Sequence, residues 1–340
     1  MLKMFILFIG FLCFNTVLPA NAQVDQFRIQ SISLPAELRD FNNQFSCLNI
    51  VRGKLYLLAE SRILENQEAK IYSVELHDLD KYLLDSTYKL PFKKHRIIGL
   101  DILVSKMLQQ QQVCEGLEAM VVKGKKVFLS VETTTSSPFC YILRGNIKKD
   151  NIYLDTTMML PVIKPVKPNG SSIYNASYEA MERRGNKLLL FFEYNYFEHR
   201  NDVYSYKTNL DALSKDSIPV NRIPYRVSDI KKVGRKHYTA INSFYKGGGN
   251  DTINRPSIAD TINFKLVHNG LAFHDYARLI DIRIKRKKFA WKPLFEIPAV
   301  YEGFNWEGIS RYKKGYFIVN DVYTPAKPYY STLFYLHPVK

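Results

Sequence analysis

One pattern of acid, glycine and acid recurs along this 340-residue chain, and it constrains the fold more than any other feature. Each copy begins with a glutamate, passes through a polar turn that contains glycine, and ends on an acid after an apolar run. The copies run from Glu118 to Glu132, from Glu179 to Glu193 and from Glu307 to Asp321, with the two acids 14 residues apart each time. Such internal repetition indicates an architecture assembled from copies of one supersecondary unit.

Each copy is typical of a β-hairpin, because apolar runs flank a polar turn with glycine. The midpoint between the two acids falls in that turn, at Lys125, Asn186 and Lys314. The spacing therefore predicts that the acids of each copy face each other across the two strands. Directly opposed side chains have Cβ atoms roughly 4.5–5.5 Å apart. Three acidic pairs at that separation need a cation, a basic side chain or a shared proton to compensate them.

Weaker copies without the leading acid run from Ser46 to Glu60 and from Ser228 to Asn242. The five copies follow one another at intervals of about 50 to 80 residues, which suits one four-stranded propeller blade per copy. We therefore expect an all-β fold, a single β-propeller of five or six four-stranded blades. Residues 332–336 are expected to form a last strand that closes the ring with an N-terminal one.

Other segments fit this architecture. Apolar and polar residues alternate over 70–76, 202–207 and 280–285. This alternation predicts outer blade strands with one face exposed to solvent. Residues 101–112 are expected to form a short helix or a surface loop.

Residues 1–22 have the features of a secretory signal peptide. Lys3 precedes an apolar stretch from Met4 to Leu18, and Ala20-Asn21-Ala22 is a small-residue cleavage site. We expect cleavage near Ala22, export to the periplasm or the extracellular space, and a mature protein without a transmembrane segment. Residues 23–340 are expected to form one propeller domain that is monomeric.

The chain is basic, with a formal net charge of +16, and its basic runs lie at 93–96, 231–236 and 283–288. Such runs are either solvated edges or an electrostatic footprint for an anionic small molecule, an envelope polyanion or an anionic membrane surface. No nucleic-acid motif is present, so we expect no specific nucleic-acid partner. The mature chain keeps Cys47, Cys114 and Cys140, an odd number that allows at most one disulfide.

Equivalent positions on the innermost strands of a propeller form a ring around its axis. The sequence therefore predicts an axial ring of the leading acids Glu118, Glu179 and Glu307. Their expected cross-strand neighbours are Glu132, Glu193, Asp321 and Glu60. Carboxylate oxygens from several directions suit Ca²⁺, and Mg²⁺ less well in an all-protein site. The ring is alternatively a structural device, balanced by protein groups, that keeps the blades in register.

The residues Trp306-Glu307-Gly308-Ile309, followed by Gly315 to Asp321, resemble an element of the esterase-like, phytase-like β-propeller family. The hairpin layout is also similar to that of the calcium-activated nucleotidases, five-bladed propellers with acids near a central Ca²⁺. Each match covers about 15 residues of the chain, and Ser46 and Ser228 depart from the acidic pattern. The resemblance implies hydrolysis of phosphate esters or related anionic esters, with Ca²⁺ as the possible cofactor.

Two functional hypotheses follow. In a cation-dependent phosphoester hydrolase, the acids hold a cation, one acid serves as general base, and basic residues bind the outer phosphate oxygens. The candidate anion-binding residues are Arg183, Arg184 and Arg311, each a few residues after a leading acid. The alternative is a non-catalytic binding propeller that recognises a glycan, a peptide or an envelope component.

Overall fold

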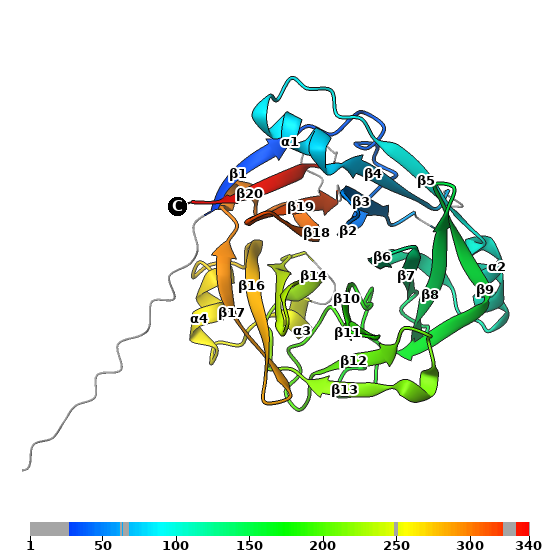
Figure 1. The fold of residues 1–340 in the computed structure, drawn as a ribbon. Helices are drawn as coiled ribbons and strands as arrows, with labels where there is room; N and C mark the ends of the chain where they lie inside the picture. Colours follow the sequence, from blue (N-terminus) through cyan, green and yellow to red (C-terminus); the bar gives the residue numbers. More distant parts are fainter. Residues whose placement is uncertain (1–26, 62, 64–67, 248–250, 322–330, 340) are drawn as a thin grey trace, which may run out of the picture.

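Twenty β-strands form five blades around a central axis in a computed structural model that describes residues 27–61, 63, 68–247, 251–321 and 331–339 (Figure 1). The expected signal peptide lies outside the described residues. Among the residues described, no helix is long and apolar enough to cross a membrane.

The blades follow one another in chain order, and each is a four-stranded antiparallel sheet. Blade 1 is β2 (Phe45–Val51), β3 (Lys54–Ala59), β4 (Lys70–Glu75) and β5 (Lys93–Ile98). Blade 2 is β6 (Cys114–Lys123), β7 (Lys126–Thr133), β8 (Phe139–Lys148) and β9 (Asn151–Ile163). Blade 3 is β10 (Ala180–Arg184), β11 (Lys187–Phe191), β12 (Asp202–Lys207) and β13 (Asp216–Pro219). Blade 4 is β14 (Arg226–Gly234), β15 (His237–Phe244), β16 (Tyr276–Lys285) and β17 (Lys288–Glu296).

Blade 5 combines the two ends of the chain. It contains β18 (Asn305–Tyr312), β19 (Gly315–Asp321), β20 (Leu333–Pro338) and, at its outer edge, β1 (Phe27–Ile32). The pairing of β1 with β20 runs from Phe27↔Pro338 to Ile32↔Leu333 and confirms the predicted closure of the ring. The strand order fixes the number of blades at five.

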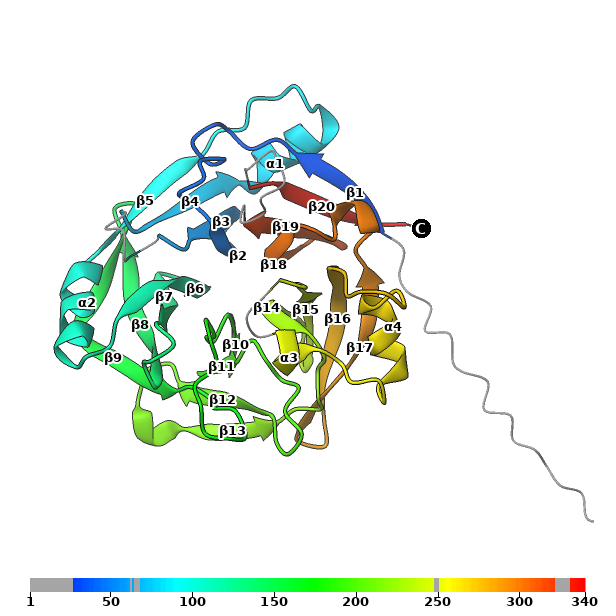
Figure 2. The same cartoon turned by 180° about the vertical axis from the view of Figure 1, so that it is seen from behind.

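The short helices belong to the connections between strands. They are α1 (Leu76–Leu84), α2 (Leu100–Gln109), α3 (Asp251–Asn254) and α4 (Thr261–Val267), with the 3₁₀ turns η2 (Ala212–Ser214) and η3 (Ala299–Tyr301). Helices α1 and α2 lie at the outer edge of the ring, and α3 and α4 lie over blade 4 (Figure 2). The helical alternative for residues 101–112 is therefore confirmed by α2. Blades 1 and 2 are also joined at their outer edges, where β5 pairs in parallel with β9 through Ile97↔Ile152 and Ile98↔Tyr153.

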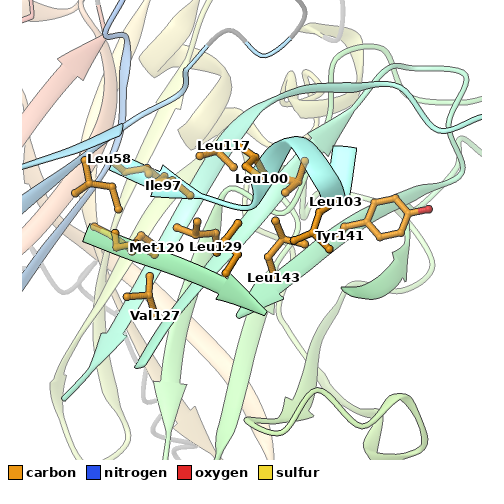
Figure 3. Close-up of a cluster of buried hydrophobic side chains, with 14 of the residues drawn as sticks. Leu58, Ile97, Leu100, Leu103, Leu117, Met120, Val127, Leu129, Tyr141 and Leu143 are labelled. Atoms are coloured by element: carbon orange, nitrogen blue, oxygen red, sulfur yellow. The ribbon is translucent and has the colours of Figure 1, made fainter. Parts of the chain in front are cut away.

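The hydrophobic core lies between neighbouring blades. Figure 3 shows the cluster between blades 1 and 2, where Leu58 and Ile97 of blade 1 face Met120 and Leu129 of blade 2. Leu103 of α2 packs into the same cluster. This packing explains why the expected wet face is wrong for β4, which is buried from Ile71 to Val74 because neighbouring blades cover both of its faces. In β16 the alternation holds at the end of the strand, where Arg283 and Lys285 are exposed and Ile282 and Ile284 are buried.

The five innermost hairpins coincide with the five copies of the sequence pattern. Each innermost strand (β2, β6, β10, β14 and β18) begins near its leading position and ends in the glycine-containing turn, so all five turns lie at the same end of the axis. Gly124 and Gly185 adopt positive φ angles of 61° and 65° there, a conformation that glycine adopts without steric cost. We refer to the two ends of the axis as the acid end and the turn end.

Candidate functional site

The innermost strands bring one residue from each blade to equivalent positions around the axis. These residues are Ser46, Glu118, Glu179, Ser228 and Glu307, and all five are buried. Where serine replaces the acid, its hydroxyl is bonded to the next blade: Ser46 Oγ donates to Leu117 O and Ser228 Oγ to Trp306 O, both at 2.6 Å. Each accepting carbonyl immediately precedes a leading glutamate. The serines therefore position the glutamates of blades 2 and 5.

The third leading glutamate is held in the same way from a different strand. Ser130, on β7, donates from Oγ to Tyr178 O at 2.9 Å, and Tyr178 immediately precedes Glu179. Ser130 Oγ also accepts a hydrogen bond from Ala119 N at 2.9 Å. All three leading glutamates thus follow a carbonyl that is fixed by a serine of the preceding blade.

The predicted face-to-face pairing of the acids is wrong in register. In blade 5, Trp306 pairs with Asn320 and Gly308 with Val319, so Glu307 is the extra residue of a β-bulge. Asp321 consequently lies opposite Asn305. A bulge re-aims the side chain that it inserts, and bulges are common beside active sites.

Bulges occur at the leading position in other blades as well. In blade 2 the register shifts between Leu117↔Val131 and Met120↔Leu129, which flank Glu118. In blade 1 it shifts across Ser46, between Phe45↔Ala59 and Cys47↔Leu58. The 14-residue spacing therefore reflects a hairpin with a bulge, and the two acids of a copy are displaced along the strands.

The bulges do not separate the acids from one another. Each of Glu118, Glu132, Glu193 and Glu307 has a pKa well above its usual range, because burial and then neighbouring carboxylates disfavour the charged form. For Glu193 and Glu307 the carboxylate of Glu179 is among those neighbours. The structure thus brings together the seven acids that the sequence predicts. This axial cluster consists of Glu60, Glu118, Glu132, Glu179, Glu193, Glu307 and Asp321.

Individual members of the axial cluster have distinct anchors. Ser177 N donates to Glu193 Oε1 at 2.9 Å, and Asn305 Nδ2 donates to Asp321 Oδ2 at 2.9 Å. Glu60 and Glu118 both border Gly116: a Cβ atom at Gly116 would lie 2.5 Å from Glu60 Cγ and 3.0 Å from Glu118 Oε1. Glycine is required there for the two carboxylates to approach each other.

Arg226 is the residue of the axial cluster's surroundings that the sequence analysis did not predict. Its guanidinium forms an ion pair with Glu307, lies 3.7 Å from Glu179 (Nε to Oε2), and donates to Asn305 Oδ1 at 2.7 Å. Burial opposes the charge, but the carboxylates of Glu179 and Glu307 raise the pKa of Arg226 above its ordinary value. Arg226 stands two positions before Ser228, as Asn305 stands two before Glu307. An alignment of the five copies shows that, two residues before the leading position, this copy alone has an arginine.

Oxygen atoms without a partner indicate which ligand the axial cluster can take. Glu132 Oε1 and Glu179 Oε2 are buried and accept no hydrogen bond, although Glu179 Oε2 lies 3.7 Å from the Arg226 guanidinium. A set of carboxylate oxygens fits a hard divalent cation such as Ca²⁺ in its chemistry. Over the described ranges, however, no three His, Cys, Asp or Glu side chains already meet in a metal-binding arrangement. Cation binding therefore requires glutamate side chains to turn toward a common point.

The candidate anion-binding arginines lie away from the axial cluster, at the turn end. Arg183 donates from Nε to Gly185 O and Arg311 donates from Nη1 to Val233 O, both at 2.6 Å. Arg184 pairs with Lys187 beside the same turn as Arg183. The role of these three arginines in anion binding stays a prediction. The arginine that contacts the axial cluster is Arg226.

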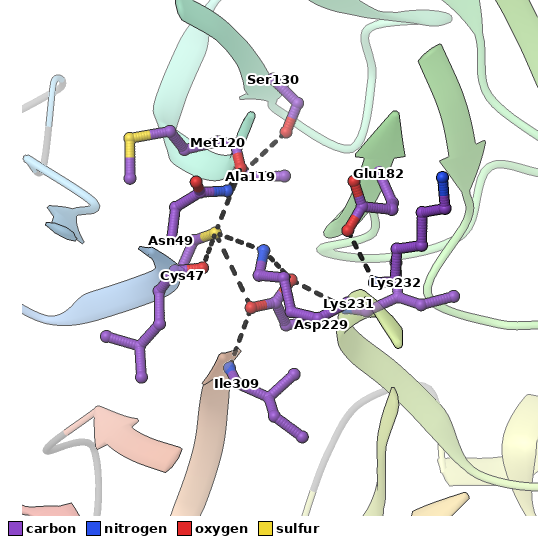
Figure 4. Close-up of polar contacts among 12 residues, drawn as sticks. Cys47, Asn49, Ala119, Met120, Ser130, Glu182, Asp229, Lys231, Lys232 and Ile309 are labelled. Atoms are coloured by element: carbon purple, nitrogen blue, oxygen red, sulfur yellow. Dashed lines mark hydrogen bonds and ion pairs between the residues drawn. The ribbon is translucent and has the colours of Figure 1, made fainter. Parts of the chain in front are cut away.

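A second buried polar group lies on the axis between the two ends (Figure 4). Lys231 Nζ lies 3.0 Å from Asp229 Oδ1 and 3.5 Å from Cys47 Sγ, and Ile309 N donates to Asp229 Oδ2 at 2.9 Å. Burial and the carboxylate of Asp229 raise the pKa of Cys47 to about 12, so this thiol is protonated at neutral pH. Cys47, Cys114 and Cys140 are all free and buried.

Comparison with known proteins adds little to this description. No protein-family model matches the chain, and no curated protein matches it significantly. A GH43 β-xylosidase/α-arabinofuranosidase from a compost microbial metagenome has a similar structure, with a TM-score of 0.47, 8% identity, and coverage of 90% of this chain and 94% of that one. A GH43_1 enzyme from Xanthomonas citri has a TM-score of 0.48 at 8% identity, covering 91% and 89%.

A putative glucose dehydrogenase from Thermus thermophilus is similar to the same degree, with a TM-score of 0.48, 9% identity, and coverage of 92% and 100%. Likenesses at this level carry no argument about activity. The propeller fold itself follows from the strand order. The esterase-like, phytase-like family is not supported by these comparisons and stays a prediction.

Proposed function

We propose that the axial cluster binds a divalent cation, Ca²⁺ in the first instance, and that the completed site hydrolyses a phosphoester or a related anionic ester. The observation that supports this proposal is the charge imbalance at the acid end. Seven acids gather there, and the guanidinium that enters the cluster, Arg226, is engaged by Glu307 and Glu179. Within the described residues, no ion pair reaches Glu118 or Glu132. The buried Lys164 lowers the pKa of Glu132 from a distance, but its Nζ donates to Thr133 O and Thr134 O. A cation bound beside Glu118 and Glu132 would offset the burial and the repulsion between carboxylates that raise the pKa values of these two residues.

Each part of the cluster has a role in this proposal. Glu118 and Glu132 hold the cation, whose chemistry when bound is to polarise a phosphoryl oxygen and to lower the pKa of a bound water. Arg226 lies beside Glu307 and Glu179, is fixed by Asn305, and attracts the outer oxygens of an anionic substrate. Glu179 serves as general base, because its Oε2 accepts no hydrogen bond and the nearby Arg226 guanidinium, which opposes the effect of burial on the pKa of this carboxyl, favours the ionised form that takes a proton from the attacking water. Glu193, with a raised pKa, holds a proton for the leaving group.

The test begins with thermal unfolding of the mature protein in EDTA and then in Ca²⁺ or Mg²⁺. A ligand that binds only the folded state stabilises it by about 2.7 kcal/mol at a hundredfold excess over Kd. We expect a rise in Tm with Ca²⁺ that is lost in Glu118→Gln and kept in Glu198→Gln, which removes the same charge from an exposed position. Phosphoester turnover is then measured with the cation that shifts Tm. No shift in metal-free wild-type protein would overturn the cation site.

A non-catalytic binding propeller is the second candidate, and one observation favours it. The insertion between β15 and β16, at the acid end, exposes Ile258 (78%), Ile262 (79%) and Leu271 (94%). Apolar side chains gathered beside a polar channel are typical of a recognition surface for a glycan, a peptide or an envelope component. Under this alternative, Ile262→Ser with Leu271→Ser abolishes ligand binding and Glu118→Gln does not.

A further inference from the structure

The turn end of the axis differs in charge from the acid end. The five innermost hairpin turns meet there, and neighbouring turns touch one another. Lys232 N donates to Glu182 Oε2 at 2.7 Å, which joins blade 4 to blade 3. Arg311 of blade 5 donates to Val233 O of blade 4 at 2.6 Å. These contacts join the turns of blades 3, 4 and 5, and Arg52 of blade 1 borders Gly124 of blade 2, where a Cβ atom would lie 3.6 Å from Arg52 Nη2.

The surface of the five turns, which we call the basic ring, is crowded with cations. Apart from the buried Lys231, the five turns carry Arg52, Lys54, Lys123, Lys125, Lys126, Arg183, Arg184, Lys187, Lys232, Arg235, Lys236, Arg311, Lys313 and Lys314. The same turns carry one acid, Glu182. Such an excess is more than a basic chain produces by chance at one place, since the whole sequence has 48 Lys and Arg against 32 Asp and Glu.

Outer turns extend the basic ring on the same face. Ile147 N donates to Lys125 O at 2.7 Å, which places the β8–β9 turn, with Lys148, Lys149 and Asp150, beside the innermost turn of blade 2. Asp150 is paired with Lys93 of β5. Ile284 N donates to Lys236 O at 3.0 Å and places the β16–β17 turn, with residues 285–288, beside that of blade 4. The cations thus cover a disc rather than a line.

Few of these charges are neutralised within the protein. Lys54 pairs with Glu75 at 2.7 Å, Lys187 with Asp216 at 3.0 Å and Lys313 with Asp80 at 2.6 Å. In the part of the chain that the structure describes, the other members of the basic ring form no ion pair. Like charges held this close repel one another, and the repulsion is relieved by an external anion.

We propose that the basic ring docks the protein on an anionic lipid surface. A disc of cations matches a plane of headgroups, whereas a single polyanionic chain would contact one arc of it. The basic ring is richer in lysine than in arginine, which suits attraction to many phosphates without a fixed bidentate geometry. This docking does not depend on the chemistry of the axial cluster.

Two exposed leucines at the rim favour lipid over a soluble polyanion. Leu84 is 91% exposed in α1, whose first residue, Leu76, donates from its N to Gly53 O at 2.8 Å. Leu213 is 96% exposed in η2, and Thr208, shortly before it, donates from its N to Asn186 O at 2.8 Å. Both leucines therefore belong to segments that begin at the turn end. Apolar side chains beside a basic surface are the pattern of interfacial membrane binding.

The experiment is co-sedimentation of the mature protein with phosphatidylcholine vesicles that contain or lack phosphatidylglycerol. The test variant K125Q/K236Q/K314Q removes three charges from the tips of three turns. The matched control K167Q/K246Q/K265Q removes three charges from positions at the acid end. The loss of three lysines that each attract the anionic membrane surface should weaken binding of the test variant to anionic vesicles about 100-fold. The control should bind as wild type does, and raised salt should weaken wild-type binding.

Several results would overturn the proposal. Equal binding to neutral vesicles, or an equal loss in the control triple variant, would show that the basic ring is not the determinant. Binding to soluble polyphosphate without binding to anionic vesicles would assign the basic ring to a polyanion instead. Tm values of both variants, measured in parallel, establish that they are folded. Leu84→Ser with Leu213→Ser should lower vesicle binding and leave polyphosphate binding unchanged if lipid is the partner.

Discussion

Lys231 and Asp229 form a buried ion pair on the propeller axis, with Nζ and Oδ1 3.0 Å apart and the side chains 7% and 0% exposed. The carboxylate also accepts a hydrogen bond from Ile309 N, so the pair connects blade 4 to blade 5. Contact with Cys47 Sγ extends it to blade 1. Burial raises the pKa of Asp229 to about 6, against the opposing effect of Lys231, so the carboxylate is ionised at neutral pH. The pair therefore holds three blades in register at the centre of the ring.

The first prediction concerns this pair. Lys231→Met should destabilise the protein by about 3–5 kcal/mol at pH 7.5, because Asp229 is left as an uncompensated buried charge. Asp229→Asn combined with Lys231→Met should recover a large part of that loss, since no buried charge remains. Urea unfolding of the two variants and wild type measures both values. A double variant as unstable as the single one would show that packing, and not charge, explains the loss.

The second prediction concerns Arg226. Arg226→Met should lower stability in EDTA by about 3–5 kcal/mol, because Glu179 and Glu307 lose the guanidinium between them. The same change should tighten Ca²⁺ binding, since one resident positive charge is removed from the axial cluster. Isothermal titration with Ca²⁺ and urea unfolding test the two effects separately. Arg222→Met is the control, because Arg222 lies over the Tyr196 ring outside the axial cluster. Weaker Ca²⁺ binding in Arg226→Met would contradict a cation site at these acids.

The third prediction is a pH dependence. The folded protein keeps protons on Glu118 and its neighbours at pH values where the unfolded chain releases them, because their pKa values are raised. The free energy of unfolding in EDTA should therefore fall as pH rises from the ordinary carboxyl pKa through the higher folded values. Glu118→Gln removes one such group and should be more stable than wild type at pH 8, by about 0.5–3 kcal/mol.

At about pH 3.5, below the ordinary carboxyl pKa, the free energy of unfolding of Glu118→Gln should approach that of wild type. Glu118 is then largely protonated in both the folded and the unfolded protein. Glu198→Gln, at an exposed site, should leave the pH profile unchanged. Thermal unfolding of the three proteins from this acidic pH to pH 8 measures these differences. A Glu118→Gln protein that is less stable than wild type at pH 8 would show that the carboxylate is compensated by protein groups.

The repeat made most of the fold accessible from the sequence. Hairpins with glycine turns are local structures, so the starts of β2, β6 and β18 could be placed within a few residues. Closure by β1 and β20 was predictable because an unpaired strand at each end would leave exposed edges. The burial of β4 was not predictable from the sequence. Both faces of β4 are covered by packing between blades, and the order of apolar and polar residues in one strand does not show that packing.

The candidate site was predictable in composition and not in detail. The spacing from Glu307 to Asp321 counts residues along the chain, and it cannot show that one of them is bulged out of the pairing. Arg226 was missed because it lies before the repeated segment in a copy that has no acid at either end. Its role depends on ion pairs with two other blades, and contacts of that range are invisible in a single hairpin.

The last prediction tests the junction where the ring closes. Gly308 follows the bulge at Glu307, and a Cβ atom there would lie 2.7 Å from Val319 Cγ1 and 2.9 Å from Leu48 N. Leu48 N belongs to the backbone of β2, so it cannot move without shifting blade 1. Gly308→Ala should therefore destabilise the protein by about 1–3 kcal/mol. At Gly303, where a Cβ atom would meet nothing within 4 Å, alanine should be neutral or stabilising by up to about 1 kcal/mol. Urea unfolding compares the two variants, and equal stabilities would mean that blade 1 does not lie against blade 5 as closely as described.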